Sequence, residues 1–112
     1  MKIAGEKHGN VMVFTLDGRI DSETSPAVQG ELMAHIQKAE KRLVLDLSAT
    51  KYVSSAGLRV FMMVAKRIDQ EGGKFVLCSL GDAVKEVLEI SGFNTVLKIC
   101  SARDDAIALA AG

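Results

Sequence analysis

The sequence predicts an α/β fold in which about four helices pack on a mixed, mostly parallel β-sheet. Short runs of apolar and β-branched residues alternate with longer segments whose apolar residues recur every three or four positions. A two-residue turn joins the first two runs, whereas a helical pattern separates every later pair, which requires crossovers between parallel strands. We expect residues 1–112 to form one domain, because this length suffices for a single core.

The chain is predicted to open with an antiparallel hairpin. The run at 11–16 is apolar and β-branched, and a weaker strand at 2–6 should pair with it. Gly9 and Asn10 tolerate the positive φ angles of a tight turn between them. The segment 19–25 that follows is expected to be a loop.

A helix over 26–39 and a central strand over 43–47 should come next. Pro26 suits a first helical position, and the strand is nearly continuous in apolar residues, as is typical of a strand covered on both faces. The segment 48–55 is read as a polar loop. The apolar positions with helical spacing are Val28, Leu32, Ile36 and Ala39.

The second half of the chain continues the alternation of helix and strand. We expect a helix from Ala56 that Gly72-Gly73 stops, a strand over 75–80, a helix that carries Val84 and Leu88 and ends at Gly92, a strand over 96–99, and an alanine-rich helix capped by Ser101 with Asp104.

The composition argues against nucleic acid and membranes as partners. Lysine plus arginine total 14 and aspartate plus glutamate total 14, so neither charge is in excess. Only 4% of residues are aromatic, which removes the stacking surface of single-strand binders. The first ten residues lack the apolar run of a secretion signal, and the last helix is too short and too poor in basic residues for a membrane anchor. We expect a cytoplasmic protein.

The cysteines and histidines do not indicate a metal site, a cofactor or an enzyme. Cys78 and Cys100 lie in strand-like surroundings and are predicted to be buried free thiols. His8 and His35, in the hairpin and the first helix, lack metal-ligand spacing with them. A serine hydrolase would need a base, and no serine lies in a Gly-x-Ser-x-Gly elbow.

The most informative segment is 45–59, where a buried strand leads through polar residues into an apolar helix. A phosphoryl group on Ser54 or Ser55 would lie by the positive end of that helix, where an anion is favoured. The simpler interpretation is that one of these serines is the helix N-cap. Gly57, likewise, either relieves crowding at the helix start or leaves the adjacent serine open to an enzyme.

Several separated segments together resemble the STAS family of anti-sigma-factor antagonists. The likeness spans nearly the whole chain and keeps the spacing. The matching segments are Leu16-Asp17-Gly18-Arg19-Ile20-Asp21, Leu45-Asp46-Leu47-Ser48, Tyr52-Val53-Ser54-Ser55-Ala56-Gly57-Leu58-Arg59, Gly72-Gly73-Lys74-Phe75 and Val87-Leu88-Glu89-Ile90-Ser91-Gly92-Phe93.

The resemblance implies a single STAS-like domain that works by binding a partner. In the family, the unmodified protein binds an anti-sigma factor that is itself an ATP-dependent serine kinase, and so frees the sigma factor. Phosphorylation of the antagonist releases it, and a serine phosphatase resets the switch. A rival within the family is a STAS subunit that acts as a scaffold in a stress-signalling or lipid-transport complex, where the serine does not switch.

The resemblance also implies which residues form the site. Many members carry Asp-Ser-Ser-Gly where this chain has Ser54-Ser55-Ala56-Gly57, so the acidic residue is absent. Ser55 is the expected acceptor, as the second serine of the pair, and Ser54 is the reserve. The partner-binding residues carried over are Asp21, Ser22, Ser54, Gly57, Leu58 and Arg59; Asp21 could equally be a turn or cap residue.

Overall fold

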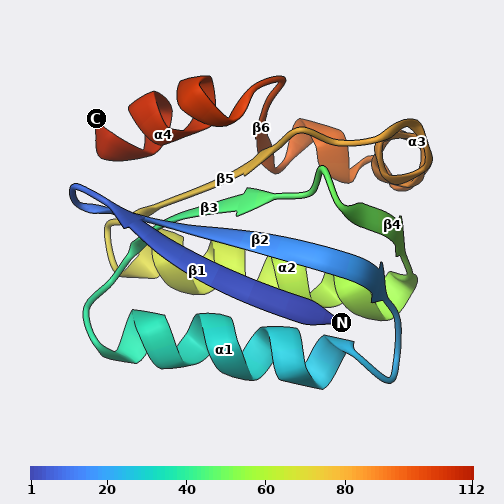
Figure 1. Ribbon diagram of the computed structural model, residues 1–112, viewed down its shortest axis with the longest axis horizontal. Helices are drawn as coiled ribbons and strands as arrows, with labels where there is room; N and C mark the ends of the chain where they lie inside the picture. Colours follow the sequence, from blue (N-terminus) through green and yellow to red (C-terminus); the bar gives the residue numbers. More distant parts are fainter.

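The computed structural model describes residues 1–112 and contains the predicted hairpin, followed by strands and helices in alternation (Figure 1). The elements are β1 (Lys2–His8), β2 (Val11–Ile20), α1 (Ser25–Gln37), β3 (Arg42–Asp46), β4 (Thr50–Val53), α2 (Ser55–Gln70), β5 (Lys74–Cys78), α3 (Asp82–Ser91), a short 3-10 turn η1 (Phe93–Thr95), β6 (Lys98–Cys100) and α4 (Arg103–Ala111).

The sheet is mixed and mostly parallel, as predicted. Its main path runs β1-β2-β3-β5-β6, and β4 pairs with the far end of β2. Only the β1–β2 hairpin is antiparallel. The hairpin turn is made by Gly9, whose φ is +61°, and by Asn10.

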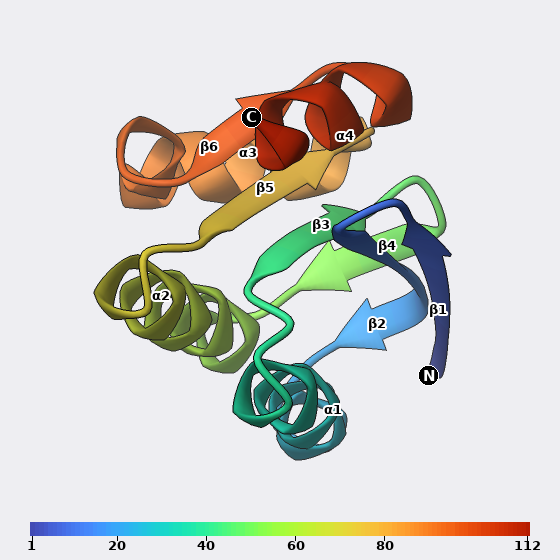
Figure 2. The same ribbon diagram turned by 90° about the vertical axis from the view of Figure 1, so that its left-hand side faces the viewer.

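The apolar strands are buried on both faces because helices cover both sides of the sheet. Helices α1 and α2 lie on one face and α4 lies on the other (Figure 2). Successive residues of β3 show the consequence: Leu43 and Leu45 belong to the larger core under α1 and α2, whereas Val44 belongs to a smaller core under α4. The prediction of a central strand covered on both faces is therefore confirmed.

Helices α1 and α2 begin at the same end of the sheet, and this arrangement positions the site. Val28, Leu32 and Ile36 face the core from α1, as their spacing predicts. The helix starts at Ser25 and ends at Gln37, so Ala39, which has a φ of +65°, lies beyond its end and is exposed. α2 stops at Gln70, and Gly72 follows with a φ of +75°.

Part of the predicted polar loop at 48–55 is a strand. Thr50–Val53 forms β4, which runs parallel to residues 18–20 and extends β2 into the segment that was predicted to be a loop. The Thr50 hydroxyl donates to the Leu16 carbonyl at 2.7 Å, and the Gly18 amide donates to the Ala49 carbonyl at 3.1 Å. These contacts between distant segments stabilise a strand too short to be evident from local sequence.

Three details at the C-terminal end also differ from the prediction. The last strand is Lys98–Cys100, because η1 occupies the residues before it. Ala102, and not Ser101, is the N-cap of α4, and it makes no side-chain cap hydrogen bond. Cys78 is a buried free thiol, and burial raises its pKa, whereas Cys100 is only half-buried.

No helix is both long and apolar enough to cross a membrane.

Candidate functional site

The predicted site residues meet where β2 and β4 end together. Ile20 pairs with Val53 across these two strands, and the Ser54 amide donates to the Ile20 carbonyl at 2.8 Å. The turn after β2, which starts at Asp21, therefore lies directly beside the start of α2. Strand β4, which the sequence analysis missed, makes this contact.

The two serines at the start of α2 have different surroundings. Ser54 is the N-cap, with extended backbone angles, and its hydroxyl oxygen accepts a hydrogen bond from the Gly57 amide at 3.4 Å. Ser54 is half-buried, whereas Ser55 is the first helical residue and is exposed. The N-cap interpretation is thus confirmed for Ser54, and the hydroxyl of Ser55 is accessible from solvent.

We expect Ser54→Ala to lower the free energy of unfolding by about 0.5 kcal/mol, the low end of the range for a lost N-cap, because the bond to Gly57 is long. Urea unfolding followed by circular dichroism measures the loss. Ser55→Ala is the matched control and should leave the midpoint unchanged. Equal losses in both variants would contradict the assignment of the cap to Ser54.

Gly57 and Leu58 contribute to packing rather than to the surface. A Cβ on Gly57 would lie 2.7 Å from Cγ2 of Ile20 and 2.9 Å from Cγ1 of Val53, so the absence of a side chain lets α2 approach the strand ends. Leu58 is 5% exposed and belongs to the main core. Leu58 was predicted to lie on the partner-binding surface, but its side chain is buried in the core.

Asp21 organises the turn between β2 and α1. Its carboxylate oxygen Oδ1 accepts hydrogen bonds from the amides of Glu23 (3.0 Å) and Thr24 (3.1 Å) and from the Thr24 hydroxyl (3.3 Å). The Thr24 hydroxyl oxygen accepts from the Asp21 amide at 2.9 Å. The pKa of the Asp21 carboxyl is lowered, mainly by the Thr24 amide, with desolvation opposing the shift. Asp21 is thus a turn residue as well as a neighbour of Ser54.

These hydrogen bonds determine the result expected for Asp21 variants. Asp21→Ala removes the acceptor and should lower the melting temperature, so it cannot test binding alone. Asp21→Asn keeps an oxygen acceptor and removes the charge, so its melting temperature should be closer to that of the wild type. A melting temperature for Asp21→Ala equal to that of the wild type would contradict the structural role.

Asp21 should also make stability depend on pH. Because its pKa is lower in the folded state, its contribution is present above the unfolded value of about 4 and is lost as the pH falls through the folded value. Melting curves of the wild type and Asp21→Asn at neutral and acidic pH measure this loss. Asp21→Asn should lose less stability on acidification, and an equal loss would contradict the assignment.

A shallow groove of about 350 Å³ separates the N-terminal turns of α1 and α2, next to the serines. Ser22 and Arg59, both carried over from the family, line it and are exposed. The other residues that line it were not predicted from the sequence, because their shared surface depends on how the two helices pack. These are Ser25, Pro26, Gln29, Ala56, Val60 and Met63.

Arg19 and Tyr52 form a second feature that the sequence analysis missed. They are partners in the β2–β4 pairing, and the Arg19 guanidinium lies 4.7 Å from the centre of the Tyr52 ring. Tyr52 is 36% exposed, so this stacked pair lies on the surface close to Asp21 and Ser54. The β-prone residues Thr50, Tyr52 and Val53 were the available signal for the strand.

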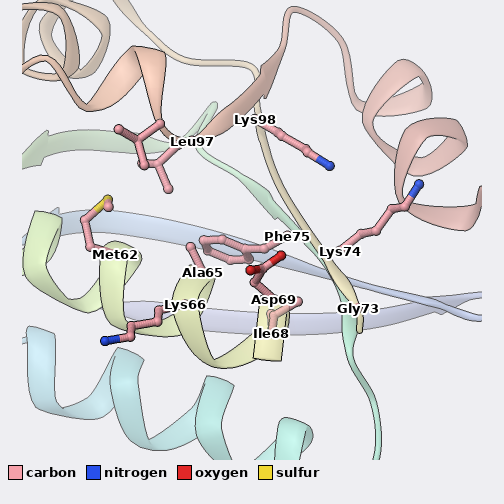
Figure 3. Close-up of a pocket in the computed structure, with 11 residues that line it drawn as sticks. Met62, Ala65, Lys66, Ile68, Asp69, Gly73, Lys74, Phe75, Leu97 and Lys98 are labelled. Atoms are coloured by element: carbon pink, nitrogen blue, oxygen red, sulfur yellow. The ribbon is translucent and has the colours of Figure 1, made fainter. Parts of the chain in front are cut away.

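Another groove, of about 470 Å³, lies at the opposite end of α2 (Figure 3). Met62 and Ala65 of the helix form one side, with Phe75 of β5 and Leu97 opposite. At a rise of about 1.5 Å per residue, its Asp69 lies roughly 20 Å along α2 from Ser55. It is therefore separate from the serine site.

The site lacks the groups that would make a serine nucleophilic. His8 ends β1 next to the hairpin turn, and His35 lies in the last turn of α1 beside Glu40. Both lie at the end of the sheet away from Ser55. No three His, Cys, Asp or Glu residues are grouped so that they could hold a metal ion. The fold and site define a small α/β domain with an exposed serine at a helix start.

The chain belongs to the STAS domain family, whose model matches residues 2–106. BtrV of Bordetella bronchiseptica, which is named as an anti-sigma factor antagonist, is 41% identical over 108 residues, covering 96% of this chain and 93% of BtrV. By homology, the chain groups with the anti-sigma factor antagonists of the family, which are regulatory proteins.

Solved structures agree with this assignment. An anti-sigma factor antagonist from Mycobacterium paratuberculosis has a TM-score of 0.90 and 26% identity, covering 99% of this chain and 94% of that one. The anti-sigma factor antagonist SpoIIAA shares the fold in its unphosphorylated form, with a TM-score of 0.79, 13% identity and coverage of 99% of both chains. Its phosphorylated form, from Bacillus, has a TM-score of 0.74 and 14% identity, covering 96% and 97%.

Proposed function

We propose that the protein is a phosphorylation-controlled anti-sigma factor antagonist. In its unmodified form it binds an anti-sigma factor that is a serine kinase, and phosphorylation of Ser55 by that kinase releases it. A serine phosphatase restores the binding form. The protein itself catalyses no reaction in this cycle.

The exposure of Ser55 carries the proposal. Ser55 is the first residue of α2 and is exposed. Ser54 is half-buried, and its hydroxyl oxygen accepts a hydrogen bond from the Gly57 amide. A kinase can reach Ser55 without unfolding the helix start. This difference favours Ser55 over Ser54 as the acceptor.

The surroundings of Ser55 suit a partner surface that a phosphoryl group would disrupt. The Asp21 turn and the groove between α1 and α2 adjoin it. A phosphoryl group adds about −1.5 to −2 charges near pH 7. In a closed interface this charge must be desolvated and lies near Asp21, whereas in the free protein the start of α2 favours an anion by about 0.3–1 kcal/mol. Binding should therefore weaken while the fold persists.

Affinity capture followed by incubation with ATP tests this function. The unmodified protein is the bait in an extract of its own cells, and intact-mass spectrometry then counts phosphoryl groups on the bait. We expect a captured protein that adds one phosphoryl group and is then released. A captured partner that stays bound and adds none would instead support a scaffold in a larger STAS assembly.

A further inference from the structure

Ser55 and Arg59 lie one helical turn apart on the same face of α2. Residues four positions apart on a helix have Cβ atoms about 5–6 Å from each other. Helical side chains lean toward the N-terminus, so the Arg59 guanidinium can reach back to the turn that holds Ser55. Both residues are exposed.

Arg59 is also free to accept a new partner. It takes part in none of the ion pairs of the protein, which engage Arg67 and Arg103 among the arginines. Arg19, another arginine near the site, is stacked on Tyr52. Arg59 therefore lies four residues from Ser55 on the helix and has a guanidinium that forms no ion pair.

We propose that Arg59 is the intramolecular counter-ion of phosphorylated Ser55. This inference rests on the proposed function, which supplies the phosphoryl group. A guanidinium can bind two phosphate oxygens at once through parallel N–H donors, a geometry that lysine cannot provide. The pair would have the phosphate N-terminal to the cation, the favourable order for helical ion pairs.

The pairing changes the partner surface in two ways at once. Arg59 lines the groove between α1 and α2 in the unmodified protein. When it pairs with the phosphate, its positive charge is neutralised and its side chain turns from the groove toward Ser55. Phosphorylation thus alters the groove as well as the serine.

The test uses protein that carries phosphoserine at position 55, introduced during translation so that no kinase is needed. Phosphorus NMR measures the second pKa of the phosphate in the wild type, Arg59→Gln and Arg59→Lys. Lys66→Gln is the matched control, because it removes one exposed positive charge from the same helix two turns further on.

We expect Arg59→Gln to raise the phosphate pKa by about 0.3 units, Arg59→Lys to restore part of the difference, and Lys66→Gln to change it less. Phosphoserine should also raise the melting temperature by about 2 °C more in the wild type than in Arg59→Gln. Equal effects of Arg59→Gln and Lys66→Gln would overturn the inference. Failure of any kinase to modify Ser55 would instead overturn the proposed function and leave this result unchanged.

Discussion

Ser55→Ala is expected to abolish labelling by the cognate kinase and to bind that kinase whether or not ATP is present. The alanine removes the exposed hydroxyl and leaves the Ser54 cap, the Asp21 turn and the groove as they are. Binding measured by calorimetry with a non-hydrolysable ATP analogue should match the wild type. After incubation with ATP, only the wild type should lose affinity.

Ser55→Glu should reproduce part of the loss of affinity that phosphorylation causes. If a phosphoryl group in the interface costs about 2 kcal/mol, the affinity falls roughly thirtyfold, which releases the kinase to another partner at comparable concentration. Glutamate carries less charge than phosphate, so its effect should be smaller, with an unchanged circular dichroism spectrum. Full affinity in phosphorylated wild-type protein would contradict the switch.

Gly57→Ala is expected to destabilise the protein although alanine favours helices. The new methyl group would lie 2.7 Å from Ile20 and 2.9 Å from Val53, and overpacking of this kind costs about 1–3 kcal/mol. The higher helix propensity of alanine offsets about 1 kcal/mol of this destabilisation. The net change should be a loss of up to about 2 kcal/mol, and Gly57→Val, which adds two methyl groups more, should lose more still.

Gly30→Ala in α1 is the matched control for Gly57. Nothing lies within 4 Å of a Cβ at Gly30, so its replacement should gain about 0.5–1 kcal/mol. Urea denaturation of both variants measures the difference in free energy of unfolding. A gain in both would show that α2 does not approach the ends of β2 and β4 as closely as the structure indicates.

The sequence was enough to predict the fold class and the order of most elements. Strands β3 and β5 and the first half of β2 are nearly continuous apolar runs because they are buried on both faces, and α1 and α2 carry regular apolar spacing. Such patterns are local and can be read directly. Strand β4 could not be read, because Thr50–Val53 is short and is stabilised by residues 16–20, some thirty positions earlier in the chain.

The site shows the same limit. The resemblance to the STAS family selected Ser54, Ser55, Asp21 and Arg59, which the structure places at one end of the sheet. It could not assign the cap to Ser54, because that depends on one hydrogen bond to Gly57. It also placed Leu58 on the surface, since a residue beside a functional motif does not reveal which way it faces; α2 turns it into the core.

Peptide mapping of the phosphoryl group decides whether Ser55 is the residue that the kinase modifies. Wild-type protein, Ser54→Ala and Ser55→Ala are each incubated with the captured kinase and ATP, digested and sequenced by mass spectrometry. We expect label on Ser55 in the wild type and in Ser54→Ala, and none in Ser55→Ala. Label that persists in Ser55→Ala and disappears in Ser54→Ala would move the switch to Ser54, and an unlabelled wild type bound to an active kinase would contradict the switch itself.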